Sequence, residues 1–180
     1  GDVYKRQGWP FGGPEVSIED AASKAIFQTY DIEGGQEIVQ DINVTAKTQQ
    51  PYSVLSRVMA YDENGRCINL TSHVRKDKLE WKAPAGKWKV IALYNSKTRQ
   101  KVKRAAPGGE GYVMNHLSKT AVKNYLSRFD RAFKSSKTSY PHTFFNDSYE
   151  VYQADWTEDF LDQFARRRGY KLEEHFPAFL

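Results

Sequence analysis

A run of reactive side chains follows an apolar stretch late in the chain. Residues 144–150 read Phe-Phe-Asn-Asp-Ser-Tyr-Glu, so a strand-like segment ends in an amide, a carboxylate, a hydroxyl, a phenol and a second carboxylate. In barrels of parallel strands alternating with helices, catalytic residues lie at the carboxyl ends of strands. A carboxylate there acts as a general acid when its surroundings hold its proton. Glu150 is therefore the candidate catalytic residue, although the same residue types also suit an ordinary loop that caps the next helix.

The neighbours of Glu150 are candidates for binding a ligand. Side chains alternate along an extended strand, so Asn146, Ser148 and Glu150 share one face while Asp147 points to the other. We expect Asn146 and Asp147 to position a substrate. Asp147 is a poor acid–base partner for Glu150 unless the strand bends.

An aromatic loop opens the chain proper. Residues 8–14 read GWPFGGP, in which the glycines permit positive φ and the prolines fix the flanking bends. Trp9 and Phe11 are candidate substrate-binding residues because an aromatic ring can stack on a ligand. They could equally plug the end of a barrel.

A basic run and a glycine-rich loop lie in the middle of the chain. Much of the excess positive charge falls in residues 97–104, where Lys103 and Arg104 are candidates for contact with substrate hydroxyls or acids. The run is either a phosphate-binding patch or a solvated strand and loop, and it lacks the interleaved aromatics of single-strand binders. Glu110, within Pro-Gly-Gly-Glu-Gly, is a further candidate for contact with substrate or ion.

Composition narrows the class of protein. The net charge of +5 is mild, so we expect no nucleic-acid partner, and no apolar run is long enough to span a membrane. Cys67 is the single cysteine, which excludes an internal disulfide and leaves no zinc motif. The chain is expected to be globular, with a sizeable core.

Four segments are expected along the chain. Residues 1–7 are an artefact, because DVYKRQ is the translation of a transposon end used to prepare sequencing libraries. Residues 8–36 and 105–180 have the mixed helix and strand pattern of an α/β protein, and residues 37–104 form a β-rich insertion. We expect the whole to be an internal piece of a longer protein.

Hydrophobic periodicity places the elements. A strand is expected over residues 25–32. Alternation then predicts strands over residues 37–44, 53–62, 66–70, 79–82 and 87–94, with a hairpin turn at Asn64-Gly65. An apolar stripe over residues 117–133 predicts a core-facing helix with Ser118 as its N-cap. A strand is expected over residues 140–148. A second helix is expected to have Thr157 as its N-cap and to end before Gly169.

Two tryptophans flank a Pro/Gly turn in the β-rich insertion. Trp81 and Trp88 could form a surface that stacks on carbohydrate, or they could pack in the core of a small sandwich. The first possibility would fit a carbohydrate-binding module without catalytic activity.

Four separated motifs occur in the order and spacing of one enzyme family. Residues 8–14 (GWPFGGP), 102–111 (VKRAAPGGEG), 145–150 (FNDSYE) and 155–161 (DWTEDFL) together resemble the bacterial α-L-rhamnosidases of glycoside hydrolase family 106. The resemblance implies an incomplete (β/α)8 barrel interrupted by an antiparallel β insertion. It also implies inverting hydrolysis, a rhamnose-containing oligo- or polysaccharide as substrate, a calcium cofactor, and a periplasmic or secreted bacterial location.

The resemblance assigns roles residue by residue. Glu150 matches the general acid at the end of the Asn-Asp-Ser-x-Glu motif. Inversion needs a second carboxylate about 6.5–9.5 Å away, and we expect that base beyond Leu180, with the calcium ligands unassigned. Asn115 stands where many relatives carry an acidic residue. The alternatives are a retaining, β-galactosidase-like barrel glycosidase and the carbohydrate-binding module.

Overall fold

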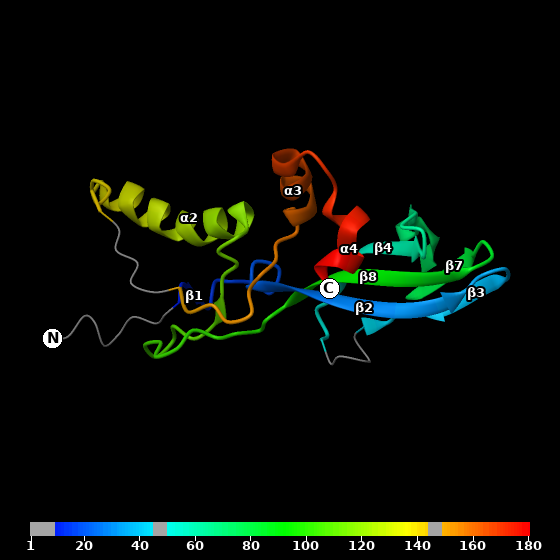
Figure 1. The fold of residues 1–180 in the computed structure, drawn as a ribbon. Helices are drawn as coiled ribbons and strands as arrows, with labels where there is room; N and C mark the ends of the chain where they lie inside the picture. Colours follow the sequence, from blue (N-terminus) through cyan, green and yellow to red (C-terminus); the bar gives the residue numbers. More distant parts are fainter. Residues whose placement is uncertain (1–9, 45–49, 144–148) are drawn as a thin grey trace. The chain divides into compact units, whose positions relative to one another are not determined.

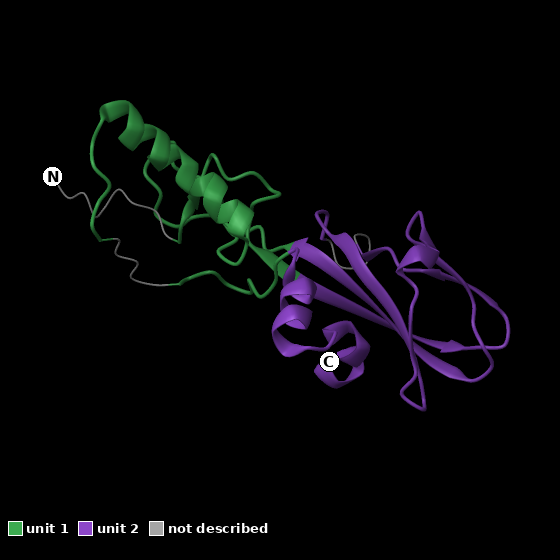
Figure 2. Ribbon diagram, turned by 90° about the horizontal axis from the view of Figure 1, so that it is seen from above, with its two compact units in different colours: residues 1–24, 97–157 green, residues 25–96, 158–180 purple. Residues whose placement is uncertain are grey.

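The computed structural model describes residues 10–44, 50–143 and 149–180. The chain forms two compact units, each built from two stretches of sequence (Figure 2). Unit 1 comprises residues 1–24 and 97–157, and unit 2 comprises residues 25–96 and 158–180. Strands predominate, and the helices are few (Figure 1).

Unit 2 is built on two sheets. The larger has the strand order β2 (Ser23–Glu33), β8 (Lys87–Lys97), β4 (Val54–Asp62) and β5 (Cys67–Asn69), with β4 antiparallel to both β8 and β5. The smaller has the order β3 (Glu37–Asp41), β7 (Lys78–Lys82) and β6 (Val74–Arg75), all antiparallel, and the short helix η2 (Thr71–His73) precedes β6. Side chains from both sheets form one core, including Val58, Leu79, Val90 and Ala92, together with Leu70 between β5 and η2.

The strands of this unit confirm the alternation read from the sequence, and no strand end differs from the expected one by more than three residues. The turn at Asn64-Gly65 is confirmed as well, because Gly65 has φ of 80° and its N–H donates to Asp62 O at 3.2 Å. Asp62 also accepts from the backbone N–H of Asn64 and of Arg66 through its side chain. One carboxylate therefore holds the β4–β5 hairpin.

Trp81 and Trp88 belong to this core. They are only 7% and 4% exposed, and their rings pack edge to face with centroids 5.1 Å apart. Trp88 Nε1 donates to Pro84 O at 3.0 Å. The interpretation of these rings as a carbohydrate-stacking surface is therefore wrong, and the core-packing alternative is confirmed.

The carboxyl-terminal helices complete unit 2. They are α3 (Phe160–Arg168), the one-turn helix η3 (Leu172–His175) and α4 (Phe176–Phe179). Phe176 is fully buried and meets the ring of Phe27 on β2 edge to face, with centroids 5.3 Å apart. Gly169 ends α3 with φ of 80°, as predicted. Thr157 is not the N-cap, because α3 begins at Phe160 with Asp159 in the cap position.

Unit 1 contains the long helix α2 (Lys119–Ser136) and the short antiparallel pair β1 (Gly12–Gly13) and β9 (Tyr112–Val113). Ser118 is confirmed as the N-cap of α2, since its hydroxyl accepts from the N–H of Ala121 at 3.3 Å. Ala121 is buried, but Leu126 and Phe129 on the same stripe are 42% and 40% exposed. The predicted helix is therefore confirmed, but the described residues cover its apolar face only in part.

The strand expected over residues 140–148 is not seen where the structure describes it. Residues 140–143 are irregular, and residues 144–148 lie outside the described part.

Candidate functional site

Glu150 lies in unit 1, half-buried, in an irregular segment that precedes the buried Val151. The side chain of Gln100 holds the backbone on both sides of Val151. Its Nε2 donates to Glu150 O and its Oε1 accepts from Tyr152 N, each at 2.8 Å. The amide side chain thus makes the two backbone hydrogen bonds that a neighbouring strand would otherwise make. These bonds fix the backbone of the candidate acid.

Gln100 is itself anchored to β9. Its backbone carbonyl accepts from Val113 N at 2.9 Å, and Val102 N donates to Gly111 O at 3.0 Å. The segment around residues 100–102 therefore lies beside β9. Through Gln100, the backbone of Glu150 is therefore connected to β9.

An aromatic row runs from the residue before Glu150 toward the amino-terminal loop. Tyr149 meets His116 edge to face at 5.2 Å, and His116 stacks on Phe11 at 6.0 Å with an interplanar angle of 18°. Phe11 in turn lies 5.9 Å from Tyr125 on α2. The structure therefore connects the predicted residue Phe11, through His116, to Tyr149, which directly precedes Glu150.

His116 and Tyr149 are both held in their neutral forms. Burial lowers the pKa of the His116 imidazole, and the contact of its Nδ1 with Met114 O opposes this only in part. Burial raises the pKa of the Tyr149 phenol. At neutral pH these rings offer hydrogen bonds without carrying charge.

Phe11 also lines a cavity of about 350 Å³ within unit 1. Tyr125, Phe129 and Arg128 line the same cavity, and the guanidinium carbon of Arg128 is 4.5 Å and 4.6 Å from the centroids of the two rings. Arg128 Nη2 donates to Tyr125 Oη at 2.9 Å, and Arg128 Nε is buried with no partner among the described residues. The cavity is apolar with one cation.

The other predicted residues are dispersed or lie outside the description. Lys103 is exposed and donates to Tyr152 Oη at 3.1 Å, which places it close to the Glu150 segment. Glu110 is exposed and accepts from Gly108 N at 2.9 Å, so it stabilises its own loop. Arg104 is exposed with φ of 52°. Trp9, Asn146 and Asp147 lie outside the described residues.

Asn115 has a structural explanation. It is 2% exposed, its Nδ2 donates to Trp156 O at 3.3 Å, and its Oδ1 accepts from Leu117 N at 3.0 Å. A carboxylate could not make the first of these bonds, so the amide suits this site. Sequence reasoning missed Gln100 and His116, and only the place of His116 after a strand could have pointed to it.

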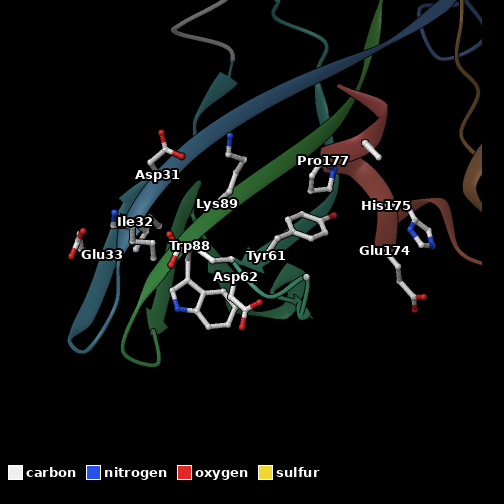
Figure 3. A pocket seen from close by; sticks show the side chains of 14 residues that line it. Asp31, Ile32, Glu33, Tyr61, Asp62, Trp88, Lys89, Glu174, His175 and Pro177 are labelled. Carbon is white, nitrogen blue, oxygen red and sulfur yellow. The ribbon is translucent and has the colours of Figure 1, made fainter.

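A larger cavity of about 670 Å³ lies within unit 2 (Figure 3). Asp31, Tyr61 and Lys89 line it from the strands, and Glu174, His175 and Pro177 line it from η3 and α4. The Tyr61 hydroxyl donates to Glu173 O, and burial raises the pKa of this phenol. Of the residues predicted to bind substrate, none of those that the structure describes lines this cavity.

In the described parts of the chain, no three His, Cys, Asp or Glu side chains come together in a way that could hold an ion. Nor does any helix there have the length and apolarity needed to cross a bilayer.

Known proteins resemble this chain over most of its length. A protein of Formosa agariphila named "Putative beta-glucuronidase" is 35% identical over 116 residues, which cover 62% of this chain and 10% of the relative. The solved structure of the rhamnosidase from Novosphingobium sp. PP1Y is 29% identical with a TM-score of 0.51, over 68% of this chain and 12% of that one. The chain thus spans about a tenth of the length of these relatives.

A family model covers most of the chain. The alpha-L-rhamnosidase family of glycoside hydrolases matches residues 46–180, a range that contains Gln100, His116 and Glu150. The chain belongs to the α-L-rhamnosidases of glycoside hydrolase family 106.

Proposed function

We propose that the chain is part of an enzyme that removes terminal α-L-rhamnose from glycans, with Glu150 as its general acid. The proposal is supported by the two hydrogen bonds through which the Gln100 side chain fixes the backbone around Glu150. Both residues lie within the range that matches the family. A general acid must keep a fixed position relative to the leaving oxygen, because misplacement by an ångström costs orders of magnitude in rate.

In this mechanism Glu150 donates its proton to the glycosidic oxygen as the bond to the sugar breaks. A second carboxylate activates water on the opposite face of the ring, which inverts the anomeric carbon. We place that base outside this chain. Phe11, Lys103, Arg104 and Glu110, with Trp9, Asn146 and Asp147, remain the proposed contacts to the glycan.

We also propose the architecture of the parent enzyme from its family membership. Residues 8–36 and 105–180 would be segments of a (β/α)8 barrel, and residues 37–104 an insertion into it. The exposed Leu126 and Phe129 on α2 support this, because a barrel helix needs further elements to cover its apolar stripe. The isolated chain is then expected to lack activity, since it has an acid without a base.

Calcium and location are proposed from the family alone. The ligands of the ion stay unassigned, and no step above depends on it. Hydrolysis of rhamnose-containing polysaccharides suits a periplasmic or secreted bacterial enzyme.

The test compares Glu150→Gln with wild type in the full-length protein that contains this chain. Turnover of rhamnosides with poor leaving groups should fall strongly, whereas activated aryl rhamnosides, which need less protonation, should be spared. Glu63→Gln, the same change at an exposed site of unit 2, is the matched control. Equal losses on both substrate classes would exclude the general-acid role. NMR of the first-formed product reports inversion or retention.

A second candidate is a β-glucuronidase, the activity in the name of the Formosa agariphila relative. Arg128 favours it, because a guanidinium that lines a cavity beside Phe11 is suited to a sugar carboxylate. Cleavage of aryl β-glucuronides in preference to aryl α-L-rhamnosides would establish this alternative.

A further inference from the structure

His116 lies in the connection between β9 and α2, next to the segment that carries the candidate acid. Its ring touches that of Tyr149 at 5.2 Å, and Tyr149 is the residue before Glu150. Adjacent Cα atoms are about 3.8 Å apart. The imidazole therefore lies roughly one side chain away from the peptide of Glu150.

The hydrogen bond to the backbone decides which nitrogen of His116 carries the proton. Nδ1 lies 2.9 Å from Met114 O, and a carbonyl oxygen can only accept, so Nδ1 is the donor. In the neutral ring Nε2 then has a free lone pair. Among the described residues no hydrogen-bond partner is seen for Nε2, and His116 as a whole is only partly buried.

The surroundings keep this lone pair available. The ring contacts are Phe11 and Tyr149, neither of which is charged at neutral pH. Burial lowers the pKa of the imidazole, so the ring is an acceptor and not a cation under neutral conditions. A neutral acceptor beside an exposed aromatic ring is suited to a sugar hydroxyl rather than to an anion.

We propose that His116 is a substrate-binding residue whose Nε2 accepts a hydrogen bond from a hydroxyl of the sugar held at Glu150, while Phe11 provides an apolar wall beside it. The inference rests on the proposed function, because it takes Glu150 as the place where the sugar is cleaved. It adds a polar contact on an element that the motif around Glu150 does not include.

Two substitutions separate this role from a structural one. The amide of Gln reaches the position of Nε2 but not that of Nδ1, and the shorter amide of Asn reaches the position of Nδ1 but not that of Nε2. His116→Asn in the full-length enzyme should keep the hydrogen bond to Met114 O and lose the hydrogen bond to the sugar hydroxyl. Its KM for an aryl rhamnoside should rise about tenfold, the effect of one lost hydrogen bond, with little change in kcat. His116→Gln should stay close to wild type.

A structural role predicts the reverse order, because only Asn preserves the contact with Met114 O. That order, or an unchanged KM in both variants, would overturn the inference. His116→Phe, which keeps the stacking on Phe11 and loses both nitrogens, should raise KM as Asn does. If the Asn variant fails to fold, the comparison of Phe with Gln still decides, since equal KM values would refute the contact.

The same measurements distinguish failure of the proposed function from failure of the inference about His116. A wild-type enzyme that cleaves no rhamnoside, or a Glu150→Gln variant that retains full turnover of substrates with poor leaving groups, refutes the proposed function and the inference with it. The inference alone is refuted if the wild-type enzyme cleaves rhamnosides and Glu150→Gln has the expected effect, but His116→Gln raises KM more than His116→Asn does.

Discussion

Phe176→Ala should strongly destabilise unit 2. The side chain is 0% exposed, and its ring packs edge to face on Phe27 at 5.3 Å. Truncating a buried Phe to Ala costs about 3–5 kcal/mol, because the transfer free energy is lost and a cavity remains. In a chain of this size each kcal/mol lowers Tm by about 2–4 °C, so a fall of roughly 6–20 °C is expected.

Urea unfolding followed through the indole N–H signal of Trp88 measures this change within unit 2. Phe179→Ala is the matched control, since Phe179 also faces Phe27, at 5.7 Å, but is 55% exposed. The free energy of unfolding of the Phe179→Ala variant should fall by less than about 1 kcal/mol. A loss below about 1 kcal/mol for Phe176→Ala, or equal losses in the two variants, would refute the packing of α4 on β2.

Three further predictions concern unit 1. Ser118→Ala should cost about 1 kcal/mol and lower the helical signal in circular dichroism, whereas Ser118→Asp, which keeps a capping oxygen, should not. Gly111→Ala should destabilise by about 1–3 kcal/mol in thermal unfolding, because the new Cβ would lie 1.9 Å from Gly13 O; a neutral outcome would contradict this approach. His116 should titrate by NMR with a midpoint below 6.5. Because the unfolded chain takes up this proton first, the neutral ring favours folding above pH 6.5, and this contribution is lost as the pH falls through the folded pKa; a midpoint at or above 6.5 would contradict it.

Elements specified by short sequence patterns were predictable. Ser118 caps α2, Gly169 ends α3, and Asn64-Gly65 turns the β4–β5 hairpin, as their residue types indicate. In each case the interaction that decides the structure joins residues within a few positions of one another. Side-chain chemistry and backbone preference then act on the same short segment.

Elements decided by distant contacts were not predictable. Thr157 looks like an N-cap, but the N–H groups of Asp155 and Trp156 donate to Ser23 O at 3.2 Å and 3.3 Å, which holds this stretch extended and delays the helix to Phe160. The support of Glu150 by Gln100 likewise joins residues fifty positions apart. Nothing in the local composition of residues 144–150 points to that amide.

The division of each unit into two separated stretches affects how the chain can fold during synthesis. Residues 25–96 leave the ribosome well before residues 158–180, although both belong to unit 2. Until then Phe27 has no Phe176 to cover it, and the sheet carries an uncovered apolar surface through the whole synthesis of residues 97–157. Contacts between such distant segments slow folding, and exposed apolar strands are where intermediates aggregate. This interval is where the nascent protein would most need a chaperone.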